Sequence, residues 1–158
     1  MHDETFLLPA FLAHYRALGV EHFVLLDDAS TDGTPALLAE QPDCTVLRSK
    51  VRYFEMVNGR RAVYAWRTEL MQLYGMGRWA LLVDADEFLV PPPGLTLPDV
   101  TASLERRGSA SAWAVMLECY PRDLSALAQM ADRPFTLDDE WYLDARPHLR
   151  VTPGAKRP

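Results

Sequence analysis

Two short apolar segments that each end in carboxylates constrain the fold of this 158-residue chain more than any other feature. "FVLLDD" covers residues 23–28 and "ALLVDADE" covers residues 80–87. Short apolar runs without alternation are typical of strands that a sheet buries on both faces. Two carboxylates about 5 Å apart repel by about 3 kcal/mol at an effective dielectric constant near ~20. The sequence therefore predicts buried strands whose acidic ends need a compensating charge or a shared proton.

Helical patterns separate the apolar runs. "LLPAFLAHYRALG" has apolar residues at helical spacing, ends at Gly19, and tolerates Pro9 only in its first turn. "TPALLAE" predicts a short helix with a cap at Thr34 and Pro35 at its first position. "NGRRAVYAWRTELMQLYG" and "LPDVTASLERRG" predict two more helices, and "CTVLRS" predicts another strand.

Helices that alternate with buried strands predict an α/β protein with a mostly parallel sheet flanked by helices. The length and apolar content fit a single domain over residues 1–158. "RWALLVDADEFLV" is the third predicted strand and "SAWAVMLECY" a further one, while the periodicity weakens beyond Pro121. Because the chain starts directly on a helix, we expect the sheet to lack its first strand, as an N-terminally shortened product would.

The composition excludes several classes of protein. The net charge of −6 and the pI near 5.1 argue against a broad nucleic-acid or anionic-membrane footprint. No apolar run approaches the ~20 residues of a membrane span, and the N-terminus lacks a signal-peptide pattern. Cys44 and Cys119 form no CxxC pair and are expected to be two buried free thiols. We therefore expect a cytoplasmic protein.

The acids at the strand ends are candidates for a metal site. Ligands of open α/β sheets bind beyond the carboxyl ends of the strands, where Asp27–Asp28 and Asp84-x-Asp86-Glu87 would meet. Hard oxygen donors suit Mg²⁺ or Mn²⁺, which would neutralise the acids and carry an anionic substrate. The alternative is that these aspartates only form turns or cap helices.

The order of these motifs resembles family 2 glycosyltransferases. "LLDDASTDGT" resembles their D-D-x-S-x-D-G-T stretch, and "RWALLVDADEFLV" resembles their W-x-x-x-x-D-x-D-E-F-L segment. "HYRALGVEHF", which leads into the first of these, resembles one subgroup of the family. Together the similar segments cover about residues 3–93.

The resemblance implies a GT-A fold and transfer of a sugar from a nucleoside-diphosphate sugar to an acceptor hydroxyl on a glycan or other molecule. It implies a UDP-sugar as the donor and Mn²⁺ or Mg²⁺ as the cofactor. The nucleotide-sugar part would occupy about residues 1–93 and the acceptor side the remainder.

The resemblance also implies roles for individual residues. Asp28 would lie by the base or ribose, and Asp84 and Asp86 would form the DxD pair. Asp86 would contact the metal directly, and Asp84 would contact ribose or metal. Glu4 would contact substrate, in a "HDE" that resembles an N-E pair with Asp3 in place of asparagine.

The start of the helix in "NGRRAVYAWR" could face the diphosphate through its backbone N–H groups and through Arg60 or Arg61. The alternative for these arginines is simple solvation of the helix surface. Glu87 would point toward the protein or support the metal ligands. His148 could be a late metal ligand, although a single histidine near a chain end is usually not one.

An inverting transferase also needs a carboxylate base for the acceptor hydroxyl. Glu118 and the acids of "LDDEW", namely Asp138, Asp139 and Glu140, are the candidates, and no spacing singles one out. We favour Asp139.

Two other functions compete with glycosyl transfer. A non-catalytic scaffold would retain the fold without the activity, in keeping with an incomplete sheet. A Mg²⁺-dependent phosphoryl transferase could use the DxD pair, but "DADEF" does not follow a first strand as such enzymes require.

Overall fold

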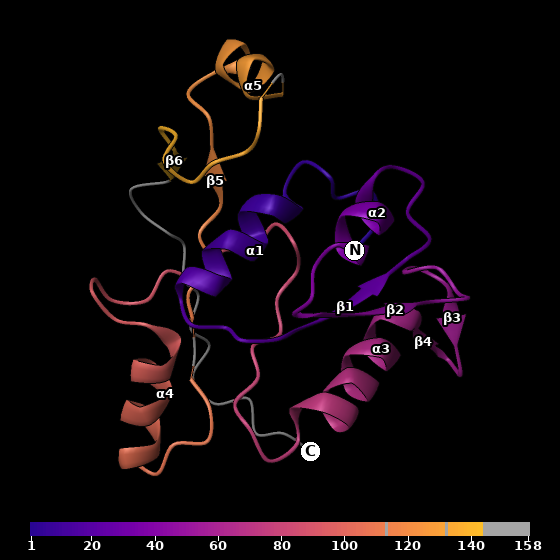
Figure 1. Cartoon of the computed structure of the whole chain (residues 1–158), viewed down its shortest axis with the longest axis vertical. Coiled ribbons are helices and arrows are strands. Elements are labelled where there is room, and N and C mark those ends of the chain that lie inside the picture. Colours follow the sequence, from indigo (N-terminus) through magenta and orange to yellow (C-terminus); the bar gives the residue numbers. More distant parts are fainter. Residues whose placement is uncertain (113, 132, 144–158) are drawn as a thin grey trace. The chain divides into compact units, whose positions relative to one another are not determined.

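The computed structural model describes residues 1–112, 114–131 and 133–143 and shows a mixed α/β architecture. The chain divides into two compact units, Met1–Ala112 and Trp113–Pro158. Figure 1 labels the helices and strands of both units. The first unit contains both predicted segments with acidic ends, residues 23–28 and 80–87.

The first unit is organised around two parallel strands. Strand β1 (Phe23–Asp27) pairs with β2 (Cys44–Arg48) in the register Phe23↔Cys44 to Asp27↔Arg48. Helix α2 (Thr34–Ala39) connects them, so the unit is a β-α-β crossover. Both strands begin at the predicted residue, β2 ends one residue before the end of "CTVLRS", and their parallel pairing confirms the α/β expectation at this level.

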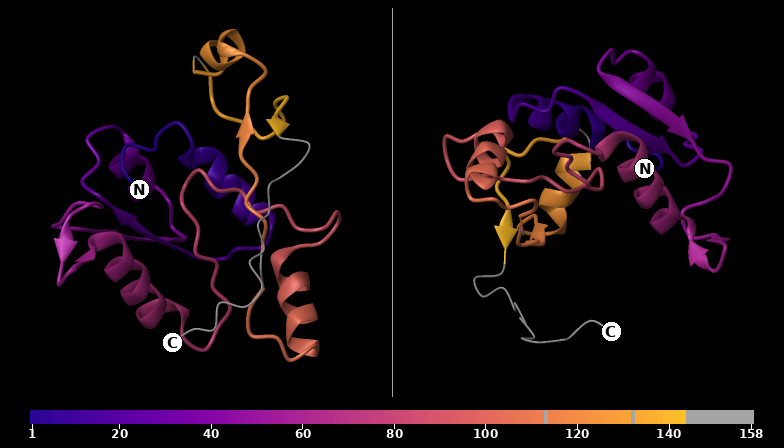
Figure 2. Two further views of the ribbon diagram at one scale, coloured as in Figure 1. Left: turned by 180° about the vertical axis from the view of Figure 1, so that it is seen from behind. Right: turned by 90° about the horizontal axis from the view of Figure 1, so that it is seen from below.

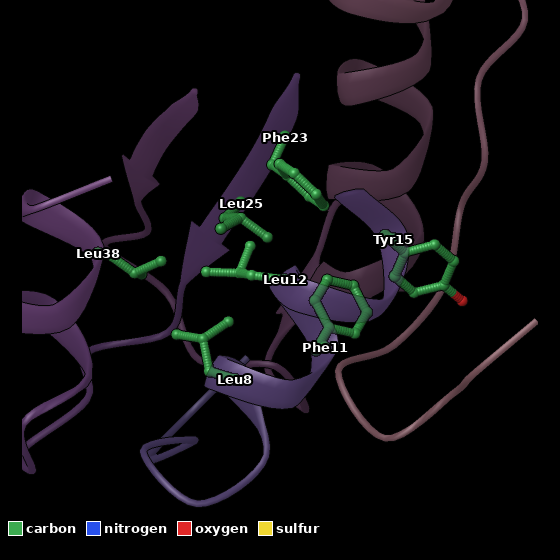
Figure 3. Packing of buried hydrophobic residues seen from close by; sticks show 7 residues of the cluster. All are labelled: Leu8, Phe11, Leu12, Tyr15, Phe23, Leu25 and Leu38. Atoms are coloured by element: carbon green, nitrogen blue, oxygen red, sulfur yellow. The ribbon is translucent and has the colours of Figure 1, made fainter. Parts of the chain in front are cut away.

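The core lies between β1 and the preceding helix α1 (Leu8–Ala17). Four residues of α1 at helical spacing meet two of β1 and one of α2, as Figure 3 shows: Leu8, Phe11, Leu12, Tyr15, Phe23, Leu25 and Leu38. The ring centroids of Phe11 and Tyr15 are 4.8 Å apart in an edge-on arrangement. This cluster positions the carboxyl end of β1, because it buries alternate residues of that strand up to Asp27.

Local signals determine where the helices begin. Pro9 lies in the first turn of α1, as predicted. In α2 the N-cap is Gly33, one residue before the predicted Thr34, and Pro35 again lies in the first turn. Helix α4 (Leu97–Arg106) starts with a capping box in which Thr96 and Asp99 bond each other's backbone N–H.

A small hairpin precedes the longest helical segment. Strands β3 (Met56–Val57) and β4 (Arg60–Arg61) are antiparallel, and Asn58 and Gly59 between them have φ angles of 50° and 78°. Asn-Gly is the pair that two-residue hairpin turns favour. Helix α3 (Ala62–Leu70) then continues into the π-helical turn η1 (Met71–Gly75). Figure 2 shows the hairpin from two further sides, at the start of α3.

Of two further predicted strands, one is absent from the described structure and the other is much shorter than predicted. Residues 79–83 of "RWALLVDADEFLV" have no regular secondary structure, and Leu81 and Leu82 are 44% and 46% exposed. Of the described residues of "SAWAVMLECY", only Cys119 and Tyr120 form a strand, β5. A strand is stable only beside a partner, and within the described residues neither residues 79–83 nor residues 114–118 have one.

The described part of the second unit contains a short helix and an antiparallel pair of two-residue strands. Strand β5 (Cys119–Tyr120) pairs antiparallel with β6 (Tyr142–Leu143). Helix α5 (Leu124–Ala131) lies between them in sequence, where we predicted weak periodicity.

Cys44 and Cys119 are both free thiols, as predicted, but Cys119 is exposed, so the expectation of two buried thiols is wrong. Burial raises the pKa of the Cys44 thiol to about 11, which makes it a poor nucleophile. Within the described residues, no helix combines the length and the apolar character that crossing a bilayer demands.

Candidate functional site

Asp28 lies at the carboxyl end of β1 and is 6% exposed. Its Oδ2 accepts a hydrogen bond from the Tyr53 backbone N–H over 3.0 Å, and its backbone C=O accepts from Arg52 over 2.9 Å. His2 Nδ1 donates to the same C=O over 2.8 Å. The other carboxylate oxygen, Oδ1, is buried and has no hydrogen-bond partner among the described residues. A buried carboxylate oxygen without a donor is costly, so this atom is a candidate to accept a hydrogen bond from a ligand.

The neighbouring Asp27 has a structural role. Its Oδ1 accepts from the backbone N–H of Ser30 over 3.0 Å, which closes the turn after the strand. Its Oδ2 lies 3.7 Å from Arg48 Nε, across the parallel pair. Both oxygens of Asp27 therefore have partners, and only Asp28 offers a free one.

The N-terminal segment binds the loop after β1 through Asp3. The Asp3 Oδ1 accepts from the backbone N–H of Thr31 over 2.6 Å and of Asp32 over 3.2 Å. The hydrogen bond from Thr31 lowers the pKa of the Asp3 carboxyl. Asp3 and Ala29 both adopt positive φ, 56° and 54°. Aspartate and asparagine tolerate this conformation better than most residues, which explains the residue type at position 3 but not alanine at position 29.

Asp32 adds further hydrogen bonds between the N-terminal segment and the loop after β1. Its Oδ2 accepts from the Thr5 hydroxyl over 2.8 Å, and its Oδ1 accepts from the Thr34 N–H over 2.9 Å. Burial raises the pKa of the Asp32 carboxyl, but the hydrogen bonds from Thr34 and Thr5 outweigh it and leave that pKa well below its usual range. Hydrogen bonds therefore join residues 2–5 to residues 28–34, the segment that begins at Asp28.

Arg67 neutralises the first acid of the DxD pair. Its Nη2 donates to both oxygens of Asp84, over 2.7 and 2.8 Å, and this hydrogen bonding raises the pKa of Arg67. Glu87 accepts the Asp84 backbone N–H at its Oε2 over 2.9 Å, which closes a turn. The crowding of acids at residues 84–87 is thus accommodated by an arginine and a local cap. Asp86 is left exposed.

Asp86 and Glu4 influence each other electrostatically although they are far apart in sequence. Burial raises the pKa of the Glu4 carboxyl, and the charge of Asp86 raises it further. The Glu4 backbone N–H donates to the Thr34 hydroxyl over 2.8 Å, which holds this segment beside the loop after β1. Two carboxylates that repel in this way would be stabilised by a shared cation.

Some of the predicted site residues are brought together, and others are not. The charge of Asp86 contributes to the raised pKa of the Glu4 carboxyl, whereas Asp84 is bound to Arg67 and Asp28 to Tyr53. No group of three or more His, Cys, Asp or Glu side chains in the described residues is arranged to hold a metal ion.

The predicted helix start near the arginines is displaced. Arg60 is exposed on β4, before the helix, and Arg61 is the N-cap of α3. The Arg61 guanidinium lies 5.7 Å from the ring centroid of Phe54, an arrangement that favours a cation–π contact. Arg61 therefore has a structural partner, and Arg60 faces solvent.

The candidate bases lie in the second unit. Glu118 is exposed. Arg133 Nη2 lies 2.6 Å from Asp139 Oδ1, and Asp139 Oδ2 is buried with no partner among the described residues. Asp139 and Glu140 line a cavity of about 350 Å³ together with Arg122 and Arg133. His148 falls outside the described residues.

Two arginines of this region were not identified from the sequence. Arg52 reaches the backbone of Asp28, and Arg67 binds Asp84. Arg67 lies in the predicted helix, where a solvent-facing role is the ordinary expectation. The signal for Arg52 is the basic segment "RSKVR", which begins at Arg48, the last residue of β2. The sequence does not show which residue either arginine contacts, because each partner is more than a dozen residues away along the chain.

Comparisons of the chain with known protein families, with curated proteins and with solved structures found no match.

Proposed function

We propose that the first unit binds a nucleoside-diphosphate sugar together with Mn²⁺ or Mg²⁺, and that the whole chain transfers the sugar to an acceptor hydroxyl. The resemblance of "LLDDASTDGT" and "RWALLVDADEFLV" to family 2 glycosyltransferases motivates the proposal. A GT-A-like fold is part of it. The observation that carries it is the buried, unpartnered Oδ1 of Asp28 at the carboxyl end of β1.

Asp28 would recognise the nucleoside. Its free oxygen needs a donor, which the imide N–H of uracil or a ribose hydroxyl can supply. Its second oxygen is already held by the Tyr53 N–H, so the carboxylate is oriented before the ligand arrives. Preorganisation of this kind reduces the entropy that binding costs.

Asp86 and Glu4 would hold the cation. Mg²⁺ and Mn²⁺ are commonly bound by one or two carboxylates plus phosphate oxygens of the substrate, so two acids whose charges interact would suffice. When bound, the ion would supply positive charge at the diphosphate leaving group. Arg52, which donates to the backbone of Asp28, would bring a further cation to the phosphates. Asp84 would stay paired with Arg67 and stabilise the turn at residues 84–87.

Asp139 is the better candidate for the base. Arg133 holds one of its oxygens and leaves the other free to accept the proton of the acceptor hydroxyl. Glu118 is exposed and remains the second candidate. Loss of transfer in Asp139→Asn with retained UDP binding, and activity in Glu118→Gln, is the expected result. The opposite pattern would assign the base to Glu118.

Titration calorimetry of the full chain with UDP, with and without Mn²⁺, tests the binding step. We expect UDP to bind more tightly with Mn²⁺, and Asp86→Asn to remove that increase. The matched control is Glu21→Gln, which removes the same charge from an exposed residue before the amino end of β1. Equal binding with and without Mn²⁺, or an equal loss in both variants, would contradict the proposal.

A non-catalytic scaffold is the second candidate, and the Arg67–Asp84 pair favours it. Arginine already neutralises the first DxD acid in the way a metal would. Failure of UDP, and of every other nucleoside diphosphate tried, to bind with Mn²⁺ present would decide for the scaffold.

A further inference from the structure

Positive charge is concentrated in one segment of an otherwise acidic chain. Of the 16 arginine and lysine residues, six lie in residues 48–67, but only one of the 22 acidic residues does. Two of the six, Arg48 and Arg67, pair with aspartates. The other four have no ion-pair partner among the described residues: Lys50, Arg52, Arg60 and Arg61. The net charge of −6 therefore conceals a local positive region.

The same segment exposes apolar side chains on the β3–β4 hairpin. Phe54 is 72% exposed and Met56 is 65% exposed. Met56 lies opposite Arg61 in the ladder, so both side chains project from one face of the hairpin. The Arg61 guanidinium also lies over the Phe54 ring, which places Phe54 beside this face. We call the exposed side chains of this region the hairpin patch: Phe54, Met56, Arg60, Arg61 and Tyr64.

The hairpin lies at the outer edge of the first unit, as Figure 1 and Figure 2 show. A Cβ atom added at its turn residue Gly59 would meet no non-neighbouring atom of the described chain within 4 Å. The patch is therefore carried by a projecting tip. A projection with exposed apolar side chains fits a deformable surface that it can enter.

We propose that the hairpin patch docks the chain on a membrane surface that contains anionic lipids. Lipid phosphates would pair with Arg60 and Arg61, while Phe54 and Met56 would enter the boundary between headgroups and acyl chains. Basic residues combined with apolar side chains are typical of peripheral membrane contacts. Long arginine side chains can lay their methylene groups along apolar surface and still reach the headgroup charges. This inference does not depend on the proposed function.

A nucleic acid is the other polyanion that a basic patch with aromatic residues can bind. The side chains of the hairpin patch favour lipid. Base stacking needs an uncovered ring face, and the Arg61 guanidinium covers one face of Phe54. Met56, the other apolar side chain on this face, has no ring on which a base could stack.

Co-sedimentation of the full chain with lipid vesicles tests the proposal. We expect binding to phosphatidylcholine vesicles that contain about one third phosphatidylglycerol, and little binding to phosphatidylcholine alone. Binding should weaken as salt is added, because salt screens exposed charges.

Arg60→Gln should weaken binding to the anionic vesicles about fivefold, since it removes one cation from the contact. The matched control is Arg107→Gln, which removes the same charge from the exposed C-cap of α4 and should change binding by less than about twofold. Equal losses in the two variants would overturn the proposal, because the positive region would then have no special role.

Met56→Ser separates insertion into lipid from adsorption by charge alone. We expect a loss of at least about fivefold, because the apolar side chain no longer leaves water on binding. Met76→Ser is its control, since Met76 is 73% exposed just beyond η1, at the other end of the helical segment. Unchanged binding of Met56→Ser, or tighter binding of the wild-type chain to a single-stranded oligonucleotide than to the vesicles, would rule out lipid as the occupant.

Discussion

The hydroxyl of Tyr15 donates a hydrogen bond to the backbone C=O of Glu87 over 2.8 Å, and so connects helix α1 to the acidic segment. The same oxygen accepts the N–H of Leu89 over 3.0 Å. Tyr15 is 1% exposed, so these bonds form inside the core. His14, the preceding residue, contacts the Leu89 C=O with its Nε2 over 2.9 Å. The segment that carries Asp86 is therefore held by α1 rather than by a strand ladder.

Replacing Tyr15 with phenylalanine should destabilise the protein by about 1–3 kcal/mol, because the Glu87 C=O and the Leu89 N–H lose their buried partner. Urea unfolding measures the difference. The control is Tyr142→Phe, whose hydroxyl contacts the exposed Glu140 and should matter by less than about 0.5 kcal/mol. Similar losses in both variants would show that the Tyr15 bonds do not hold the segment.

Truncating Leu12 should have the largest effect on the core. Leu12 is 1% exposed between α1 and β1, so Leu12→Ala should lower the free energy of unfolding by about 2–5 kcal/mol. Val90→Ala removes apolar atoms from a side chain that is 78% exposed and should change it by less than about 0.5 kcal/mol. Thermal or urea unfolding of both variants measures the contrast, and a small loss for Leu12→Ala would contradict the described packing.

Glu4 should make stability depend on pH with an unusual sign. Its folded-state pKa is raised by burial and by Asp86, so its ionisation opposes folding. The cost is absent below the unfolded pKa, grows as the pH rises toward the folded pKa, and is constant above it. Glu4→Gln should therefore stabilise the chain at neutral pH and have little effect at pH values below the unfolded pKa.

Urea unfolding of Glu4→Gln across this pH range checks the sign. If Glu4 also helps to hold a cation, the same variant should bind Mn²⁺ more weakly in the presence of UDP. A variant less stable than wild type at neutral pH would mean that Glu4 has a favourable partner that outweighs the repulsion from Asp86.

Ala29 should be more stable as glycine. Its φ of 54° lies in the left-handed region, where an alanine side chain is strained and glycine is not. We expect Ala29→Gly to raise the free energy of unfolding by about 0.5–1 kcal/mol. The control is Ala13→Gly in the exposed middle of α1, which should lower it by about 1 kcal/mol. Destabilisation in both would show that residue 29 is not strained.

Elements with strong local signals were predictable from the sequence. Helix α1 follows from its apolar spacing and Gly19, and α4 from its amphipathic pattern. Strands β1 and β2 follow from short apolar runs bounded by turn residues. The Asn58-Gly59 hairpin was missed because the same letters also precede a good helix pattern, although Asn-Gly is a recognised turn signal.

The candidate site was predictable only in part. That Asp28 ends a buried strand is legible from "FVLLDD", whereas its unpartnered oxygen is a result of the surrounding fold. The pairing of Asp84 with Arg67 spans 17 residues and two elements, so neither residue reveals its partner. The roles assigned to Asp86, Glu4, Asp139 and Glu118 stay predictions.

Local backbone preferences and apolar periodicity act over a few neighbouring residues, so the order of letters alone determined helices α1, α2 and α4, strands β1 and β2 and the acidic end of β1. Strand formation at residues 79–83 depends on a ladder partner, and charge compensation at Asp84 depends on which side chain packing brings within reach. Those two outcomes require contacts between distant segments, and only the folded chain decides them. Which donors and acceptors pair depends on which surfaces the fold brings together. The composition gives only the groups that are available.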